Sequence, residues 1–238
     1  MQAPWDFFYS ARDGNISDVK RRLDDGVRAN SQDENGHTAL IYASGNGHEA
    51  VCELLITRGC NVDMQDKDGY TALILASLKG HEAVCELLIT RGCNLDMQDK
   101  VGSTALMIAS RNGHKAVCEL LITRGCNVDM QDKDGYTALI WASAKGHKAV
   151  CELLITRGCN VDMQNINGDT ALMTASYKID YRGHIPLVIS LIKAGCDYSL
   201  RNEEGKSAMD YLRENHPDKV EEVQVSRSPT AVVTHSLI

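Results

Sequence analysis

The chain has 238 residues, of which 43% are hydrophobic and 5% aromatic, and its formal net charge is −7 at pH 7. A negative chain argues against general nucleic-acid binding, which needs a broad basic surface facing the phosphate backbone. No run of about 18 apolar residues occurs, and the first residues, MQAPWDFFYSARDGN, lack the pattern of a secretory signal. We therefore expect neither membrane insertion nor export.

Residues 1–32 carry a helical pattern in which Val19 and Leu23 keep the spacing of core positions. Lys20, Arg21 and their neighbours make the other side polar. A terminal repeat needs such a surface because one of its sides faces water. We predict that residues 1–32 form an N-terminal capping repeat that lacks a leading loop.

A period of 33 residues follows the cap, and such a period predicts a stack of similar structural repeats. Its second and fourth copies differ at only four positions. The predicted repeats span 33–65, 66–98, 99–131, 132–164 and 165–201, the last with four extra residues at 179–182, and a C-terminal capping half-repeat spans 202–223.

Each repeat contains two short helical patterns. TALILAS (71–77) is apolar on nearly all sides, which predicts a buried helix with Thr71 as its N-cap. HEAVCELLITRG (81–92) has an apolar stripe at helical spacing, and Gly92 fits a left-handed residue at its end. The following NLDMQDKVG is rich in turn residues. The expected order is helix, loop, helix and turn-rich connector.

This repeat resembles the ankyrin repeat. The resemblance implies an all-α solenoid of stacked antiparallel helix pairs with hairpin-like loops, curved so that loops and first helices line a concave face. Thr-Ala-Leu-Ile or Thr-Ala-Leu-Met replaces the usual Thr-Pro-Leu-His, and we expect apolar packing to replace the lost histidine contact. The matching residues are Asp66, Gly69, Thr71-Ala72-Leu73, Ala76-Ser77, Gly80-His81, Val84, Leu87-Leu88, Gly92 and Asn94-Leu95-Asp96.

The nine cysteines follow the period of the repeats. Cys52 and Cys60 lie eight residues apart, about 12 Å along a helix and beyond disulfide reach. We expect small, buried, reduced thiols, which favour a cytoplasmic or nuclear location.

The histidines at the starts of the second helices form a ladder, and the resemblance implies that they bind backbone of a neighbouring repeat. No nucleophile, base and orienting group come together in any motif. We predict no catalytic, cofactor-binding or metal residues, and no enzyme. A metal- or thiol-dependent enzyme that uses the His and Cys ladders is the contrasting alternative. The ladder comprises His48, His81, His114, His147 and His184.

The positions that vary between copies are the candidates for function. The resemblance implies that they line the concave face and the loop tips, where ankyrin-repeat proteins bind protein partners. We predict a monomeric scaffold or adaptor that binds a protein segment there. The predicted binding residues are Lys67, Asp68, Tyr70, Leu78, Lys79, Lys100, Ser103, Arg111, Asn112, Lys133, Asp134, Tyr136, Lys145, Tyr177 and Lys178.

Over the first five repeats the variable positions carry seven cations, all of them among these residues, and four carboxylates, Glu34, Asp68, Asp134 and Asp169, a charge of +3 against −7 for the chain. This difference predicts a partner segment of acidic character. Another variable set, in the middle of the first helices, is expected mainly to fill the core, with Trp141 partly exposed. It consists of Tyr42, Leu75, Ile108, Trp141 and Thr174.

Residues 224–238 have no periodicity and predict a flexible tail. Its end, Ser236-Leu237-Ile238, resembles a ligand of PDZ domains. A two-surface adaptor that also uses this tail is therefore the alternative within the binding class. The insertion at 179–182 fits either a binding loop or a tolerated change in loop length.

Overall fold

The computed structural model describes residues 5–177 and 184–225. Its regular elements there are helices, and one isolated antiparallel bridge joins Gln32 and Thr38. The chain forms two compact units, Met1–Lys133 and Asp134–Ile238, called here the N-terminal and C-terminal units. No helix of the described part is both long and apolar enough to cross a membrane.

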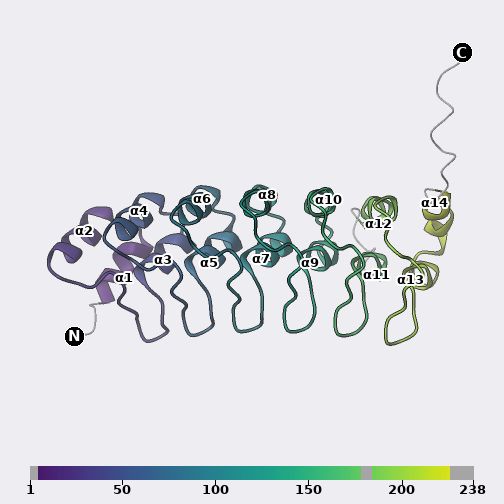
Figure 1. Cartoon of the computed structure of the whole chain (residues 1–238), viewed down its shortest axis with the longest axis horizontal. Coiled ribbons are helices and arrows are strands. Elements are labelled where there is room, and N and C mark those ends of the chain that lie inside the picture. Colours follow the sequence, from purple (N-terminus) through teal and green to yellow (C-terminus); the bar gives the residue numbers. More distant parts are fainter. Residues whose placement is uncertain (1–4, 178–183, 226–238) are drawn as a thin grey trace, which may run out of the picture. The chain divides into compact units, whose positions relative to one another are not determined.

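In the N-terminal unit, helix pairs stack with their first helices in one row and their second helices in another (Figure 1). Hairpin-like loops project on the side of the first helices. The first helices are α1 (Trp5–Arg12), α3 (Ala39–Gly45), α5 (Ala72–Lys79) and α7 (Ala105–Asn112), and the second are α2 (Ile16–Asp24), α4 (Glu49–Thr57), α6 (Glu82–Thr90) and α8 (Lys115–Thr123).

The C-terminal unit repeats this arrangement with three helix pairs in its described part. Its first helices are α9 (Ala138–Ala144), α11 (Ala171–Tyr177) and α13 (Ala208–Asn215), and its second are α10 (Lys148–Thr156), α12 (His184–Lys193) and α14 (Val220–Val225), the last preceded by the 3-10 turn η1 (Pro217–Lys219). Because α14 reaches Val225, the helix extends two residues into the segment predicted as tail.

The first helices form where the sequence predicts them. The Thr71 hydroxyl accepts the backbone N–H of Ile74 and so caps α5. Gly80 ends this helix in the left-handed conformation, with φ 75°. Ile74 and Met107 stand where the ankyrin pattern has histidine, and both are buried. Apolar packing therefore fills these sites, as predicted.

The second helices bury one stripe and expose the other side. Val84, Cys85 and Leu88 are buried in α6, and the same three positions are buried in α4 and α8. On the exposed side, Arg91 forms an ion pair with Glu53 of the preceding repeat. Exposed pairs of this kind contribute little to stability, so the buried stripe holds the row together.

The hairpin of the second repeat is fixed by one buried carboxylate and one glycine. Asp66 Oδ1 accepts the N–H groups of Asp68 and Tyr70, both at 2.8 Å. Gly69 has φ +84°, and a Cβ there would lie 2.8 Å from the nitrogen of Lys100 in the next hairpin. The Lys100 N–H also donates to the Asp68 carbonyl at 2.9 Å. Adjacent hairpins of the N-terminal unit are therefore in direct backbone contact.

Candidate partner-binding surface

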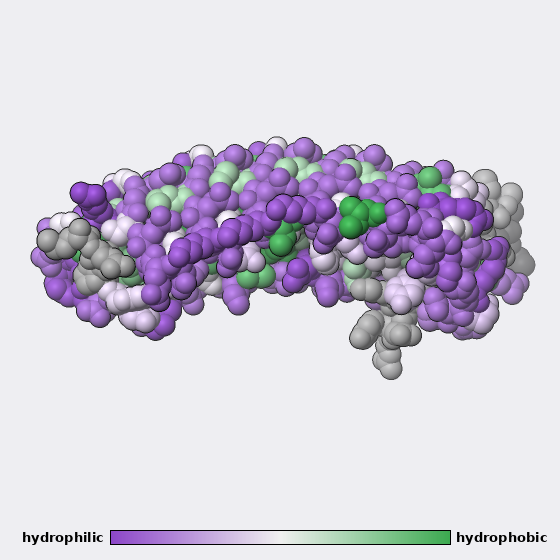
Figure 2. All heavy atoms as spheres, turned by 90° about the horizontal axis from the view of Figure 1, so that it is seen from below, coloured by the Kyte–Doolittle hydropathy of each residue, from purple (hydrophilic) through white to green (hydrophobic). Residues whose placement is uncertain are grey.

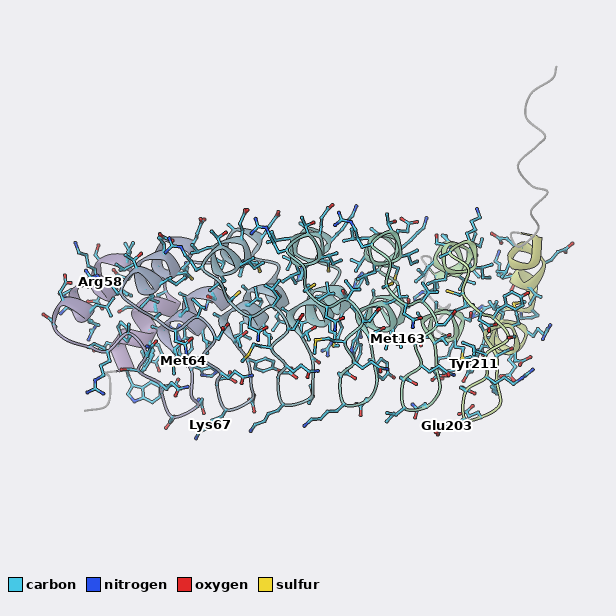
Figure 3. The ribbon with its side chains drawn as sticks, viewed as in Figure 1. Arg58, Met64, Lys67, Met163, Glu203 and Tyr211 are labelled. Carbon is cyan, nitrogen blue, oxygen red and sulfur yellow. The ribbon has the colours of Figure 1, made fainter. Side chains whose placement is uncertain are left out.

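The side chains on the hairpins and on the adjoining face of the first helices form what we call the hairpin–helix surface. In each unit, the hairpin ends are mostly hydrophilic with isolated hydrophobic side chains (Figure 2). Val101 and Ile166 are two such side chains, 61% and 59% exposed. Lys67 and Glu203 extend from the tips of their hairpins (Figure 3). The surface comprises the second, third, fifth, tenth, thirteenth and fourteenth positions of the repeats, counted from Asp33, Asp66, Asp99, Asp132, Asn165 and Asn202.

Most of the predicted binding residues are accessible on this surface. Tyr70, Leu78 and Tyr136 are half-buried. The exposed ones are Lys67, Asp68, Lys79, Lys100, Arg111, Asn112, Lys133, Asp134, Lys145 and Tyr177.

Ser103 is a wrong prediction, because it is only 4% exposed. Its backbone N–H donates to Asp99 Oδ1 at 2.8 Å, which holds the residue inside the base of the hairpin. The longer side chain of Tyr70, at the same position of the preceding repeat, stays half-buried. A serine is too short to reach the surface from this position.

Several other predicted features lie outside the described residues. These are Lys178, the insertion at 179–182, and the tail residues Ser236, Leu237 and Ile238.

The tenth position of the repeat is a functional candidate that the sequence interpretation assigned mainly to the core. Ile108 is buried as expected, whereas Tyr42, Leu75, Trp141 and Thr174 are half-buried. These four side chains line surface pockets. The sequence did contain a signal for this role, because these side chains vary between otherwise near-identical copies, whereas true core positions of these repeats scarcely vary.

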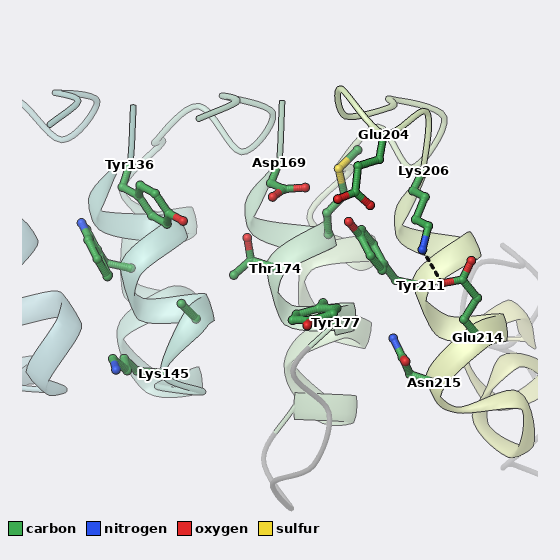
Figure 4. Close-up of a pocket in the computed structure, with 13 residues that line it drawn as sticks. Tyr136, Lys145, Asp169, Thr174, Tyr177, Glu204, Lys206, Tyr211, Glu214 and Asn215 are labelled. Atoms are coloured by element: carbon green, nitrogen blue, oxygen red, sulfur yellow. Dashed lines mark hydrogen bonds and ion pairs between the residues drawn. The ribbon is translucent and has the colours of Figure 1, made fainter. Parts of the chain in front are cut away.

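The larger pocket, here the C-terminal pocket, has a volume of about 430 Å³. Two aromatic pairs line it. Tyr136 stacks on Trp141 with ring centres 4.6 Å apart. Tyr177 meets Tyr211 edge to face with ring centres 5.5 Å apart. The residues come from the first helices α9, α11 and α13 and the hairpins before them (Figure 4).

Charged groups surround the Tyr211 side of this pocket. The Asn202 amide nitrogen donates to Asp169 Oδ1 at 2.7 Å and lies 2.8 Å from the Tyr211 hydroxyl. Lys206 pairs with Glu214 at 2.6 Å, and its ammonium lies 5.3 Å from the centre of the Tyr211 ring. Burial raises the pKa of Tyr211, so its hydroxyl stays protonated at neutral pH.

The smaller pocket, about 200 Å³, lies in the N-terminal unit beside α3 and α5. His37 Nε2 is 3.2 Å from Asp66 Oδ2, and the Tyr42 hydroxyl donates to Asp33 Oδ2 at 2.8 Å. Burial and this hydrogen bond raise the pKa of Tyr42 to about 12. Burial acts to raise the pKa of Asp33, but the hydrogen bonds from Tyr42 and the His37 backbone lower it overall.

The two units carry opposite charge on the hairpin–helix surface. The described part of this surface in the N-terminal unit carries five cations and two carboxylates, Glu34 and Asp68. The described part in the C-terminal unit carries two cations and five carboxylates. The sequence-based count stopped before the sixth repeat and so omitted Glu203, Glu204 and Glu214. The C-terminal carboxylates are Asp134, Asp169, Glu203, Glu204 and Glu214, and the cations are Lys67, Lys79, Lys100, Arg111 and Lys133 in the N-terminal unit and Lys145 and Lys206 in the C-terminal unit.

The cysteines are free thiols, buried except for the half-buried Cys60. Burial raises the pKa of Cys85 to about 11, and a hydrogen bond with Ser77 only partly offsets this effect. Such thiols stay protonated at neutral pH and are poor nucleophiles. In residues 5–177 and 184–225, no cluster of three or more His, Cys, Asp or Glu side chains is arranged to hold a metal ion.

Two histidines of the ladder, His48 and His114, contact backbone, as the ankyrin resemblance implied. His48 Nε2 lies 2.8 Å from the Arg12 carbonyl oxygen, and His114 Nε2 lies 3.1 Å from that of Leu78. Each contact reaches the preceding repeat. The neighbouring Gly47 leaves the space that the His81 ring occupies, because a Cβ there would lie 2.8 Å from Nδ1. These histidines therefore hold neighbouring repeats together.

A family model for ankyrin repeats, described as three copies, matches residues 7–99 and 84–165. The chain belongs to the ankyrin-repeat family. A second ankyrin model, described as many copies, matches residues 154–212. Among curated proteins, ankyrin repeat-containing protein YIL001W of Saccharomyces cerevisiae is 45% identical over 51 residues. That alignment covers 21% of this chain and 10% of the yeast protein.

Solved ankyrin-repeat structures have the same fold. The ankyrin repeat domain of Bcl-3, described as a member of the IkappaB protein family, matches with a TM-score of 0.81 and 26% identity. The match covers 94% of this chain and 100% of the Bcl-3 domain. The human ASB11 ankyrin repeat domain also has a TM-score of 0.81, with 24% identity over 94% of this chain and 99% of that one. Ankyrin repeats generally serve protein–protein interaction and are typically non-catalytic.

Proposed function

We propose that this ankyrin-repeat chain is a non-catalytic scaffold or adaptor that binds a segment of a partner protein on its hairpin–helix surface. One observation carries the proposal. Side chains that are repeated among the copies fill the core and the contacts between repeats, whereas those that vary gather on this surface. A rigid, preformed surface of this kind loses little conformational entropy on binding.

The chemistry of the N-terminal unit favours an acidic partner segment there. Lys67, Lys79 and Lys100 are exposed on its hairpins and first helices. Tyr70 lies half-buried among these cations. Aromatic and basic side chains are common at the energetic centres of protein interfaces, and complementary charge speeds association. We place the acidic part of the partner on this unit.

Two observations speak against an enzyme that uses the ladders. The Cys52 and Cys85 thiols have raised pKa values, and the histidine nitrogens of His48 and His114 are already in contact with backbone carbonyls. Catalytic groups need accessible side chains with pKa values suited to proton transfer or attack. The reduced thiols also fit the cytoplasmic or nuclear location that we propose.

The test is a triple charge reversal on the hairpin–helix surface, Lys79→Glu, Arg111→Glu and Lys145→Glu. The partner is first recovered by affinity purification from native cells and identified, and its affinity for the purified full chain is then measured. We expect the triple variant to bind at least about tenfold more weakly, since the reversed charges at Lys79 and Arg111 repel an acidic segment.

The matched control reverses three exposed lysines on second helices, with the same change in net charge. These are Lys20, Lys115 and Lys193. The control is expected to keep the affinity of the unmodified chain. Equal affinity of both variants, or loss only in the control, contradicts the proposed location of the binding surface.

A further inference from the structure

The smaller pocket, in the N-terminal unit, is open where one residue has no side chain. Gly45 is the last residue of α3 and stands at the thirteenth position of its repeat, where the following copies carry Leu78, Arg111 and Ala144. A Cβ at Gly45 would lie 3.5 Å from Leu75 Cδ1, an ordinary van der Waals distance. Both residues line the pocket, so a side chain at Gly45 would occupy it without a clash.

The backbone does not require a glycine at this position. The other glycines within residues 5–177 and 184–225 have positive φ, a conformation that glycine adopts more readily than any other residue. Gly45 instead has the helical conformation of α3, in which glycine is less favourable than residues with a side chain. Neither backbone conformation nor helix stability therefore accounts for Gly45, and the space that it leaves is what distinguishes this position.

The polar groups around this space already contact partners within the protein. The Tyr42 hydroxyl donates to Asp33 Oδ2 at 2.8 Å. His37 lies between two carboxylates, with Nδ1 3.4 Å from Asp33 Oδ2 and Nε2 3.2 Å from Asp66 Oδ2. The Asn46 amide nitrogen donates to the Tyr42 carbonyl oxygen at 2.8 Å. An apolar group can enter the pocket without breaking any of these contacts, whereas a polar group would find few free partners.

The rest of the lining matches one aliphatic side chain. Ile41 and Leu75 supply hydrocarbon surface, and the stem of Lys79 adds more. The volume of about 200 Å³ is below the roughly 300–1,000 Å³ usual for whole small ligands, so the pocket has the size for one side chain of a larger molecule.

Charge at the edge of the pocket indicates what stands beside that side chain. The Lys79 side chain is exposed, and in the described part of the chain it has neither an ion pair nor a side-chain hydrogen bond. A carboxylate next to the aliphatic side chain complements this cation.

We propose that the smaller pocket binds a leucine side chain of the partner segment, and that an acidic residue next to this leucine contacts Lys79. The inference rests on the proposed function and adds an apolar anchor to it. Leucine has no polar atom that needs a hydrogen bond, and its removal from water favours binding. The neighbouring carboxylate sets the orientation of the segment on the surface.

Short peptides test the pocket without the partner. The purified full chain is titrated with acetyl-Glu-Leu-Glu-amide, and saturation-transfer NMR measures the contact of the leucine methyl groups with the protein. Two comparison peptides replace the leucine by alanine or both glutamates by lysine. We expect saturable binding of the leucine peptide at millimolar concentration, and binding about tenfold weaker after either replacement.

Gly45→Leu fills the pocket with the side chain that the next repeat carries at Leu78. It is expected to weaken binding of the leucine peptide at least about tenfold. The midpoint of its urea unfolding is expected to equal or exceed that of the unmodified chain, because leucine favours a helix more than glycine does. The matched control, Ala50→Leu, enlarges an exposed residue of the second helix α4 in the same repeat and is expected to leave binding unchanged.

Several results overturn the assignment. They are equal binding of the leucine and alanine peptides, tighter binding of the lysine peptide, unchanged binding by Gly45→Leu, and no saturable signal up to about 10 mM leucine peptide. A lower unfolding midpoint for Gly45→Leu would show that the fold itself needs this glycine. A dimer of the full chain that Gly45→Leu converts to a monomer in sedimentation would assign the pocket to a second copy instead.

Failure of this inference is distinguishable from failure of the proposed function. If the leucine peptide does not bind but the triple charge reversal still weakens partner binding, the proposed function stands without this anchor. If the triple charge reversal leaves partner binding unchanged while Gly45→Leu still abolishes binding of the leucine peptide, the pocket stands and the proposed location of the acidic segment is wrong.

Discussion

At the scale of single residues, the same side-chain type acts differently according to depth. Cys85 is fully buried beside Ser77, and its pKa is raised to about 11 by the lack of water around the thiol. Cys60 is only half-buried, yet burial also raises the pKa of its thiol, to about 12. Thiol chemistry is therefore suppressed at the half-buried Cys60 as well as at the fully buried Cys85.

Thiol labelling tests this suppression. At pH 7.5 the native chain is expected to react with an aromatic disulfide reagent about a hundredfold more slowly than the unfolded chain, since a pKa two units higher leaves a hundredth of the thiolate. Complete unfolding should then release nine reactive thiols. Rapid labelling of several thiols in the folded chain would show that the burial described here is wrong.

The same thiols predict how stability depends on pH. Below the ordinary pKa of 9.0, Cys85 is protonated in both states and contributes nothing. Between pH 9.0 and about 11, the unfolded thiol loses its proton while the folded one keeps it, so the free energy of unfolding falls as pH rises. The slope from one thiol is at most about 1.4 kcal/mol per pH unit.

Denaturant unfolding between pH 8 and pH 10.5 measures this effect. Cys85→Ala is expected to reduce the downward slope relative to the unmodified chain, whatever its effect on stability at pH 7. An unchanged slope would mean that the Cys85 thiol ionises equally easily in both states.

At the scale of the elements, glycine serves two different purposes within one repeat. Gly69 and Gly92 both have positive φ, 84° and 80°. A Cβ at Gly69 would meet the backbone of the next hairpin at 2.8 Å, whereas nothing lies within 4 Å of one at Gly92. The first glycine allows close stacking of hairpins, and the second only ends a helix.

Two alanine substitutions separate these purposes. Gly92→Ala is expected to cost about 1 kcal/mol, from the left-handed conformation alone. Gly69→Ala is expected to cost about 2 kcal/mol more, because the hairpins must also move apart. Urea unfolding of both variants gives the comparison, and equal losses would contradict the described contact between hairpins.

The N-caps of the first helices could be predicted from the sequence. Thr71 caps α5, as the pattern predicted, and Gly80 ends the helix. These features were predictable because they are local and recur with the period. The burial of Ser103 was not predictable, because it depends on the depth of the hairpin base and not on the chemistry of the serine side chain. Trp141 illustrates the same difficulty, because helical spacing does not show whether a neighbouring repeat covers a side chain or leaves it beside a pocket.

At the scale of the whole molecule, the net charge of −7 does not describe the hairpin–helix surface, whose charge differs between the two units. Cations prevail on the described hairpin–helix surface of the N-terminal unit, and carboxylates prevail on that of the C-terminal unit. Counting over five repeats predicted a surface of net positive charge, because the acidic sixth repeat was left out. A partner that matches both units carries both signs of charge.

Salt provides a check on this electrostatic view. Partner affinity is expected to fall about tenfold or more between 50 mM and 500 mM sodium chloride, because exposed charges more than a few ångströms apart are screened. The triple variant Lys79→Glu, Arg111→Glu and Lys145→Glu should show a weaker salt dependence. An affinity that rises with salt would indicate apolar contacts instead.

The central claim is that the hairpin–helix surface receives the partner, and lysine footprinting tests it most directly. The free chain and its purified complex are acetylated under identical conditions, and the extent of modification at each lysine is measured by mass spectrometry. The account predicts protection of Lys67, Lys79 and Lys100 in the complex, with Lys20, Lys115 and Lys193 unchanged. Protection of the second-helix lysines, with the first three still fully modified, would contradict it.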